Sequence, residues 1–336
     1  PSYVIGGKLN SSGMNAQLGH SPYFVAEADE SDASFLFLKP MMAVVTNIDA
    51  DHLETYQGDF SILRETFVEF LHHLPFYGLA VVCGDDKEIA SIIPKIARPL
   101  RIYGFDEKAH YRATHWVQDG LVSKFTVTRP SPYRPLTLEF SCPGRHNVLN
   151  ALAAIAIATE LGVSDEAIVS GLKKFQGVGR RFQLLGEAEF SQGKKALFID
   201  DYGHHPREIR STIDAFRQVW PNRRLIHVFQ PHRYSRTQSL LNDFVDVLTL
   251  ADQVLLFDIY AAGEAEIQGI TSQKIADLVN HQCANKVKLI DTLGIEQELQ
   301  QIIQDGDVIL MQGAGNIGQM ALNLIQKINR INDEPN

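Results

Sequence analysis

The sequence predicts an α/β protein of two domains, each built around a largely parallel sheet. Short apolar runs rich in Val, Ile, Leu and Phe alternate with segments whose apolar residues recur at helical spacing, a pattern typical of βα units. Polar residues gather directly after many of these runs, as they do at the ligand-binding edge of an open sheet. A chain of 336 residues also exceeds the usual limit of a single core.

The first domain is expected to hold a sheet with helices and an antiparallel extension. Four short apolar runs are predicted to be strands: PYFVA (22–26), MMAVV (41–45), LAVVC (79–83) and LRIYGF (100–105). Segment 59–74 has helical spacing, with Asp59 placed as its N-cap. Between residues 110 and 140 the pattern changes to KFTVTR and LTLEF around Gly and Pro, which indicates an antiparallel edge sheet.

Two helices close this domain. Segment 142–162 is Ala-rich and ends at Gly162, a natural left-handed terminator. Segment 164–175 starts at Ser164, a good N-cap, and carries acidic residues in its first turn. GVGRRF (177–182) then breaks the pattern, so we place the boundary there, with domains at 1–180 and 181–336.

The second domain is predicted to be a doubly wound parallel sheet. Its five apolar strands are KALFIDDY (195–202), RLIHVFQ (224–230), QVLLFDIY (253–260), KVKLI (286–290) and DVILMQG (307–313). Amphipathic helical stretches separate them, namely 206–220, 239–251, 272–282 and 295–304. Strict alternation of strand and helix over about 150 residues is typical of a Rossmann-like domain.

Composition excludes several classes of protein. A net charge of −9 argues against nucleic acid as a partner, because such proteins carry a basic surface. No apolar run reaches the length of a membrane span, so no membrane partner is expected. The three cysteines, Cys83, Cys142 and Cys283, are far apart and indicate free thiols in the cytoplasm. The chain starts at Pro1, so we expect it to be a piece of a longer protein.

Acidic residues after the first apolar run predict a cation site. Glu27 follows PYFVA and His52 follows MMAVV. If both runs are parallel strands of one sheet, both side chains emerge at the same carboxyl edge. Carboxylates with one imidazole suit Mg²⁺, which takes few protein ligands. Asp29, Glu30 and Asp32 are expected to have supporting or surface roles.

Three strand ends of the second domain carry polar loops: IDDYGHHP (199–206), FQPHRYSRT (229–237) and DIYAAGEA (258–265). The guanidinium groups of Arg233 and Arg236 suit a carboxylate or phosphate. Asp200 or Asp201, with His204 nearby, could move a proton. One such loop alone would indicate only solvated side chains, but three in succession favour a ligand site.

GAGNIG (313–318) matches a dinucleotide-binding pattern, between an apolar strand and a helical segment. Only eighteen residues follow Gly318, which leaves no room for the acidic residue about 20 positions on. The glycines are therefore expected to let the turn pass close to a substrate or a neighbouring loop. The chain also lacks the G-x-x-x-x-G-K-[ST] phosphate loop.

Taken together, these motifs resemble the Mur ligases of peptidoglycan synthesis. The segments that carry the resemblance run in order from residue 1 to the low 320s: EADESDASF, TNIDADHLETY, LPFYG, GRHNVLNALAA, GVGRRF, DDYGHHP, QPHRYSRT, DIYAAGEA and QGAGNIG. The pattern is most similar to the branch of the family that joins L-alanine to UDP-N-acetylmuramate. The resemblance implies a central ATPase domain and a Rossmann-like domain that binds the amino acid. The N-terminal UDP-binding domain and the phosphate loop would precede this chain, which alone would be inactive.

The resemblance also implies roles for single residues. ATP and Mg²⁺ are the implied cofactors, with Glu27 and His52 as metal ligands. Adenine and ribose would contact His146, Asn147, Asn150 and Asp201. Arg181 would contact the ATP phosphates and act in catalysis with His204. The amino acid or the acyl phosphate would be held by Tyr202, His232, Arg233 and Arg236.

One feature of related ligases is absent from this sequence, and three alternatives stay open. No lysine occurs between Lys39 and Lys87, so the carbamylated lysine of several Mur ligases is missing; Glu65 or Glu69 could replace it, but a solvated helix face suits both better. The alternatives are the tripeptide ligase of cell-wall recycling, a nicotinamide dehydrogenase using GAGNIG, and a non-enzymatic binding scaffold.

Overall fold

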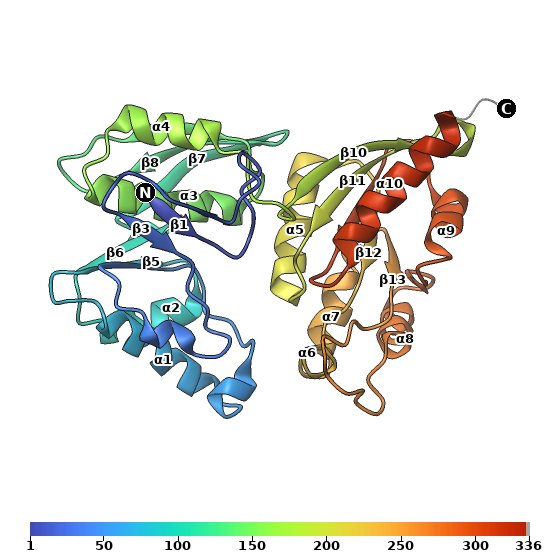
Figure 1. Ribbon diagram of the computed structural model, residues 1–336, viewed down its shortest axis with the longest axis horizontal. Coiled ribbons are helices and arrows are strands. Elements are labelled where there is room, and N and C mark those ends of the chain that lie inside the picture. Colours follow the sequence, from blue (N-terminus) through green and yellow to red (C-terminus); the bar gives the residue numbers. More distant parts are fainter. Residues whose placement is uncertain (334–336) are drawn as a thin grey trace. The chain divides into compact units, whose positions relative to one another are not determined.

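The computed structural model describes residues 1–333 and the side chains of residues 1–329. The chain divides into two compact units, Pro1–Gln176 and Gly177–Asn336, here called unit 1 and unit 2. Figure 1 shows the helices and strands of each unit. Both units combine parallel strands with helices, which confirms the predicted α/β class.

Unit 1 contains a six-stranded sheet with the spatial order β4-β5-β6-β7-β8-β9. Its strands are β4 (Met42–Val45), β5 (Leu79–Cys83), β6 (Leu100–Gly104), β7 (Tyr111–Asp119), β8 (Val122–Thr128) and β9 (Leu136–Phe140). The first four are parallel neighbours, and β7, β8 and β9 pair antiparallel. The predicted antiparallel segment is therefore confirmed as the edge of this same sheet.

The three helices of unit 1 predicted above begin and end close to the predicted residues, and a further short helix lies between two strands. They are α1 (Phe60–His72), α2 (Lys87–Ile92), α3 (Arg145–Glu160) and α4 (Asp165–Lys174), with short 3₁₀ turns η1 (Ser34–Phe37), η2 (Leu53–Tyr56) and η3 (Ile93–Lys95). Asp59 caps α1 through Ser61 N, and Ser164 caps α4 through Ala167 N. Gly162 has a φ of 71° directly after α3, as a left-handed helix terminator does. In Figure 1, α1 and α2 lie on one side of β5 and β6, and α3 lies on the other.

The expected sheet membership of PYFVA is wrong. Its strand β3 (Phe24–Ala26) belongs to a small sheet with β1 (Ser2–Val4) and β2 (Ala16–Gln17), in the order β2-β1-β3. β3 pairs parallel with β1, whereas β4 pairs with β5. All three residues of β3 are exposed, so it is not the buried strand that its apolar residues indicate. Composition identifies a strand here, but the pairing partner depends on contacts distant in sequence.

Unit 2 contains a second six-stranded sheet, in the order β10-β11-β15-β12-β13-β14. The five predicted strands are β11 (Lys195–Asp201), β12 (Leu225–Phe229), β13 (Gln253–Leu256), β14 (Val287–Leu289) and β15 (Asp307–Gln312), all parallel. The sequence pattern misses β10 (Gln183–Glu189), which pairs antiparallel with β11 at the sheet edge. Gly186 and the polar residues Gln183, Glu187 and Glu189 give this segment little strand signal.

Helices connect these strands as a doubly wound sheet requires. They are α5 (Pro206–Val219), α6 (Tyr234–Ser239), α7 (Leu241–Leu248), α8 (Ser272–Gln282), α9 (Ile295–Ile302) and α10 (Ile317–Asp333). The central strands are buried along their whole length, as parallel strands with helices on both faces are. Because the strands are parallel, the loops after β11, β12 and β13 leave the sheet at one edge.

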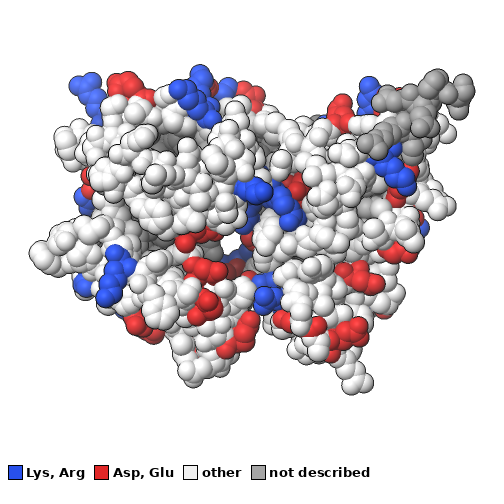
Figure 2. Space-filling model, viewed as in Figure 1, with Lys and Arg blue, Asp and Glu red and all other residues white. Residues whose placement is uncertain are grey.

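The surface and the thiols agree with the composition. On the face shown in Figure 2, acidic and basic side chains are interspersed. Cys83 and Cys142 are buried, Cys283 is partly buried, and all three are free thiols. Within residues 1–333, each helix is too short or too polar to span a bilayer.

Candidate active site

The polar loops after β11, β12 and β13 come together in unit 2, as their positions in the sequence predict. The rings of Tyr202 and His204 lie 5.4 Å apart, and those of His204 and His232 lie 5.7 Å apart. Tyr260, after β13, stacks on His232 with 5.6 Å between centroids. Four side chains from three loops therefore form one continuous cluster at the carboxyl edge of the sheet.

Hydrogen bonding fixes the tautomer of His204. Its Nδ1 lies 3.2 Å from the carbonyl oxygen of Tyr202. Because a carbonyl oxygen only accepts, Nδ1 carries the proton and donates it. The basic nitrogen of the neutral ring is then Nε2, the atom that would take up a further proton.

His232 has the opposite tautomer. Arg236 lies with Nη1 3.3 Å from His232 Nδ1, and because a guanidinium only donates, Nδ1 is the acceptor and Nε2 carries the proton. Burial, followed by the nearby charges of His204, Arg236 and Arg233, lowers the pKa of His232 to about 4. The ring is therefore neutral at pH 7 and presents an N–H donor, which suits an anionic ligand.

Arg233 is held in a strained conformation beside this cluster. Its backbone has φ 70° and ψ 139°, a region that is nearly restricted to glycine. The backbone N–H of Arg233 donates to Tyr260 O over 2.9 Å, which ties the residue to the loop after β13. Its Nε is buried and has no hydrogen-bond partner among the described residues. A buried guanidinium nitrogen without a partner is costly unless an anion completes it.

The two acids at the end of β11 are already engaged with the protein. Asp200 pairs with Arg180, with 3.1 Å between Oδ2 and Nε. Burial raises the pKa of Asp200, and the charge of Arg180 opposes that rise. Asp201 accepts hydrogen bonds from Phe182 N, Gly203 N, Thr212 Oγ1 and Gln312 Nε2. In this conformation both carboxylates organise the loops around them.

The carboxylate that does meet His204 is Glu208, in the first turn of α5. Its Oε2 lies 3.5 Å from His204 Nδ1, and its Oε1 accepts a hydrogen bond from Arg181 Nη1 over 3.1 Å. Sequence reasoning missed Glu208, although its spacing of four residues from His204 at a helix start is the signal that could have identified it.

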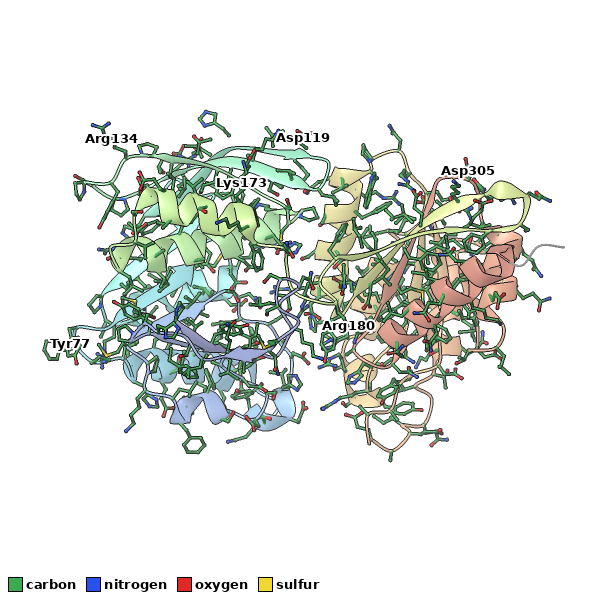
Figure 3. All side chains as sticks on the ribbon, turned by 45° about the horizontal axis from the view of Figure 1, so that its top comes forward. Tyr77, Asp119, Arg134, Lys173, Arg180 and Asp305 are labelled. Carbon is green, nitrogen blue, oxygen red and sulfur yellow. The ribbon has the colours of Figure 1, made fainter. Side chains whose placement is uncertain are left out.

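The glycines of GAGNIG pack against the chain itself. A Cβ on Gly315 would lie 2.4 Å from Gln230 Oε1 and 3.0 Å from Tyr260 Cγ. A Cβ on Gly318 would lie 2.5 Å from Arg180 Nε, and Arg180 also donates to Gly313 O over 2.6 Å. Figure 3 labels Arg180 in the loop before β10. The turn passes close to neighbouring loops, as the sequence predicts, and these contacts account for the glycines without a dinucleotide.

In unit 1, the structure places Glu27 and His52 on loops of different sheets. The prediction that both leave one sheet edge is therefore wrong, because β3 pairs with β1 and not with the sheet of β4. Glu27 follows β3, and its Oε2 accepts a hydrogen bond from Gly6 N over 2.5 Å. The Gly-rich segment after β1 is thus in direct contact with the predicted metal ligand.

His52 lies within an acidic cluster. Its imidazole is 3.6 Å from Asp51 and 3.8 Å from Glu54. Burial, and then the charge of Asp29, raise the pKa of Glu30, while His52 lowers it. Tyr56 holds this loop by donating to Glu30 O, and burial followed by the nearby carboxylates raises the pKa of Tyr56 to about 12. This crowding of negative charge is the kind that a divalent cation relieves.

Two of the other acids after β3 accept hydrogen bonds from nearby backbone N–H groups. Asp29 accepts from Ser31 N, and Asp32 accepts from Ser34 N, each over 2.9 Å. Glu65 and Glu69 are exposed on α1, which agrees with a solvated helix face. Among the residues that the structure describes, no group of three or more His, Cys, Asp or Glu side chains is arranged to hold a metal ion. The two-ligand site of Glu27 and His52 stays a prediction.

The predicted adenine-binding residues start α3. His146 and Asn150 are one turn apart and so share a helix face. Asn147 donates from Nδ2 to Pro143 O over 2.8 Å, so its amide holds the preceding turn. A glycine with φ 97°, Gly144, precedes the helix. The structure keeps the three residues together on the first turns of the helix.

Asp85, at the carboxyl end of β5, is a second residue that sequence reasoning missed. It accepts from Phe105 N over 3.0 Å and from Arg145 Nη2 over 2.5 Å. The Arg145 guanidinium also lies 4.3 Å above the Phe105 ring. Asp85 thus joins the ends of β5 and β6 to the start of α3, and its position directly after an apolar strand was the available signal.

Comparison with known families matches both parts of the chain. Residues 9–158 match the Mur ligase middle domain, and residues 180–315 match the glutamate ligase domain of Mur ligases. Relatives include the UDP-N-acetylmuramate–L-alanine ligases of Legionella pneumophila strains Corby and Paris. Each is 66% identical over 328 residues, which cover 98% of this chain and 70% of the relative.

Solved structures of similar fold include three ligases. The UDP-N-acetylmuramate–alanine ligase of Thermotoga maritima is 26% identical with a TM-score of 0.78, covering 99% of this chain and 70% of that one. A MurF ligase of the same organism, solved with ADP, is 19% identical with a TM-score of 0.72, covering 98% and 74%. A murein peptide ligase of Psychrobacter arcticus is 22% identical with a TM-score of 0.69, covering 98% and 71%.

Proposed function

Because this chain belongs to the Mur ligase family, we propose that it forms the central and C-terminal parts of an ATP-dependent ligase that joins L-alanine to UDP-N-acetylmuramate. The observation that carries the proposal is the cluster after β11, β12 and β13. There the buried Arg233 Nε, which has no hydrogen-bond partner within the described part of the chain, lies beside the neutral, donating His232. Such donors suit the carboxylate of an amino acid. The 66% identity to L-alanine ligases supports this substrate.

In this proposal, unit 2 holds the amino acid. Arg233, Arg236 and the Nε2–H of His232 bind its carboxylate, because all three present donors and neither guanidinium deprotonates. Tyr202 and Tyr260 contact the two histidines on either side. A small amino acid such as L-alanine is the proposed occupant.

His204 is the proposed base in this arrangement. Its Nδ1 donates to Tyr202 O, so Nε2 is the nitrogen that would accept a proton from the ammonium group of the amino acid. The freed amine then attacks the activated carboxyl carbon of the muramate, a C–N bond forms, and phosphate leaves. The activated species would be an acyl phosphate, formed when an oxygen of the muramate carboxylate bonds to the γ-phosphorus of ATP and the bond to the bridging oxygen breaks, so that ADP leaves.

The nucleotide is the second proposed ligand. His146, Asn147 and Asn150 at the start of α3 would contact adenine, Asp201 would lie near the ribose, and Arg181 would bind phosphate. Of these, Asp201 is buried with four donors in the described conformation, so its contribution would be to fix the loop from Tyr202 to His205.

Mg²⁺ is the proposed metal of unit 1. Glu27 supplies a carboxylate and His52 an imidazole within an acidic cluster, and the negative charge around Glu30 fits a divalent cation. When bound, Mg²⁺ would offset negative charge on the phosphates. The three free thiols support a reducing, cytoplasmic setting for these reactions.

Turnover is proposed to require the family's UDP-sugar-binding domain and phosphate loop. A direct test joins the N-terminal part of a Legionella pneumophila relative to this chain and measures phosphate release with ATP, UDP-N-acetylmuramate and L-alanine. Release that depends on L-alanine is the expected result, with none from the chain alone. No L-alanine-dependent release by the joined protein would contradict the proposal.

Two alternatives differ in their acceptor or cofactor. Faster turnover with a tripeptide than with L-alanine as the acceptor would indicate the recycling ligase, so comparing the two turnover rates separates these functions. Binding of NADH would indicate a dehydrogenase. The packing of Gly315 and Gly318 against the chain's own side chains favours the ligase over the dehydrogenase.

A further inference from the structure

One carboxylate connects two residues to which the proposed function gives separate tasks. Glu208 accepts from His204 N over 2.9 Å and from His205 N over 3.2 Å with Oε2, which also lies 3.5 Å from His204 Nδ1. Its Oε1 accepts from Arg181 Nη1 over 3.1 Å. The two oxygens therefore contact the proposed phosphate-binding arginine and the proposed base.

A helix cap alone explains only part of this arrangement. Glu208 and His205 form a reciprocal capping box at the start of α5, and acids in a first helical turn are favourable. The cap requires Glu208 to accept from the backbone of His205 and His205 to accept from the backbone at the helix start. It does not require the ion pair with Arg181 or the contact with the His204 ring, and exposed ion pairs add little to stability.

The charge of Glu208 is maintained by its neighbours. Burial raises the pKa of the carboxyl, but His204 and Arg181 and the backbone donors outweigh that effect, so the pKa is lowered overall. Glu208 is therefore ionised at pH 7. An ionised carboxylate beside Nδ1–H holds an imidazole in one tautomer and stabilises the imidazolium form.

We propose that Glu208 is a positioning residue that fixes His204 as a base at Nε2 and holds Arg181 beside it; this rests on the proposed function of those two residues. When the amino acid's N–H bond breaks, a new N–H bond forms at His204 Nε2, and Glu208 stabilises the resulting positive charge. Phosphates that bind Arg181 would compete with Glu208 for its guanidinium. The full charge of Glu208 would then act on His204, which links the strength of the base to the presence of the nucleotide.

Other side chains lie near His204 as well. Tyr202 lies on the same loop, and the neutral His232 contacts the ring from the loop after β12, where the charges of Arg236 and Arg233 act on His232. These two guanidinium charges disfavour protonation of His204. Glu208, on α5, opposes them with its negative charge.

The test variant is Glu208→Gln. Glutamine accepts hydrogen bonds and serves in capping boxes, so it keeps the helix cap and removes only the charge. The matched control is Asp252→Asn. Asp252 also accepts from an arginine and a backbone N–H, namely Arg217 Nη2 over 2.8 Å and Leu225 N over 2.7 Å, but it lies at the opposite ends of the strands.

The first measurement uses the chain itself. Long-range ¹H–¹⁵N spectra of the imidazole rings, recorded against pH and assigned with His204→Gln, report both tautomer and pKa. We expect Nδ1–H in the wild type and a pKa of His204 that falls by about half a unit or more in Glu208→Gln, with no change in Asp252→Asn. Equal pKa values for His204 in wild type and Glu208→Gln would overturn the proposal.

The second measurement uses the joined, active protein. Glu208→Gln is expected to lower kcat at least tenfold and move the acidic limb of the rate profile to lower pH, while the KM for UDP-N-acetylmuramate stays constant. Equal melting temperatures of Glu208→Gln and wild type would show that the cap is intact, and an unchanged kcat would contradict a positioning role. If the wild type shows no L-alanine-dependent turnover, the proposed function fails, and the spectra still decide the role of Glu208.

Discussion

The backbone conformation at position 233 favours glycine, so a glycine there should make the folded chain more stable than another residue would, although the proposed site depends on the side chain of Arg233. Its backbone, at φ 70° and ψ 139°, costs about 1–3 kcal/mol for a residue with a Cβ. Glycine relieves that strain but loses about 0.5–1 kcal/mol more conformational entropy on folding. The mid-range values of the two terms differ by about 1 kcal/mol, so Arg233→Gly is expected to be more stable than Arg233→Ala by about that amount.

Comparing these two variants isolates the backbone term. Both remove the guanidinium, including the buried Nε that no described residue partners, so that contribution cancels. Both are also expected to lose L-alanine-dependent turnover by about 10–200-fold, because hydrogen bonds to charged groups contribute about 1.5–3 kcal/mol. Stability and activity should thus change independently at this one position.

The assay is urea unfolding of the chain, followed by the fluorescence of Trp220. This side chain packs on Phe182 and Phe216 within unit 2, and replacing Trp116 by Phe in all variants removes the other tryptophan. With a slope of about 2 kcal/mol per molar urea, the midpoint of Arg233→Gly should exceed that of Arg233→Ala by about 0.5 M. A midpoint equal to or below that of the alanine variant would refute the argument from strain.

Three further predictions follow from other sites. Gly315→Val should lower the free energy of unfolding by about 1–3 kcal/mol, because the valine side chain would meet Gln230 and Tyr260. NADH fluorescence should show no saturable binding to the wild type. Saturable binding would favour the dehydrogenase. His227 is buried, and burial lowers its pKa from 6.5 to about 3, so the unfolded chain takes up a proton first and stability should fall as pH drops from about 6.5 towards 3. His227→Leu should flatten that part of the stability profile measured by urea unfolding, and an unchanged slope would count against this explanation. Glu27→Gln should lower turnover at least tenfold at limiting Mg²⁺, and turnover should recover in part at high Mg²⁺. The control Glu69→Gln, at an exposed position on α1, should leave turnover unchanged at both Mg²⁺ concentrations. Equal Mg²⁺ dependence in both variants would exclude Glu27 as a ligand.

The architecture of unit 2 was largely predictable from the sequence, for a local reason. Buried parallel strands are continuous apolar runs, and the residues that follow each run must lie at one edge of the sheet. That rule predicts that Tyr202, His204 and His232 lie together, as the structure shows. The rule does not identify β10, because an edge strand that is half exposed needs no apolar run and because Gly186 interrupts its pattern.

What the sequence did not predict depends on pairing and on side-chain direction. The apolar residues of β3 indicated a strand, but nothing local specified β1 as its partner, so Glu27 and His52 were wrongly placed on one sheet edge. Asp201 follows the strand as a site residue would, yet its carboxylate is saturated by the protein. The sequence position of Glu208 indicates an ordinary helix cap, and only the structure shows that Glu208 contacts Arg181 and His204.

The domain roles proposed for the two units and the individual ligand contacts stay predictions. The structure supports them through donors and acceptors whose tautomers and charges are fixed by neighbours, as at His204 and His232. The outward-pointing Tyr77 in the loop between α1 and β5 (Figure 3) has no part in this proposal, although it is exposed and pairs edge-on with Phe76.

Phosphate release by the joined protein, measured with L-alanine, with a tripeptide and with no acceptor, tests the central claim most directly. The account predicts release that requires ATP, UDP-N-acetylmuramate and L-alanine together, and that falls at least tenfold in Arg233→Ala. Release that is equal with and without L-alanine, or faster with the tripeptide, would contradict it.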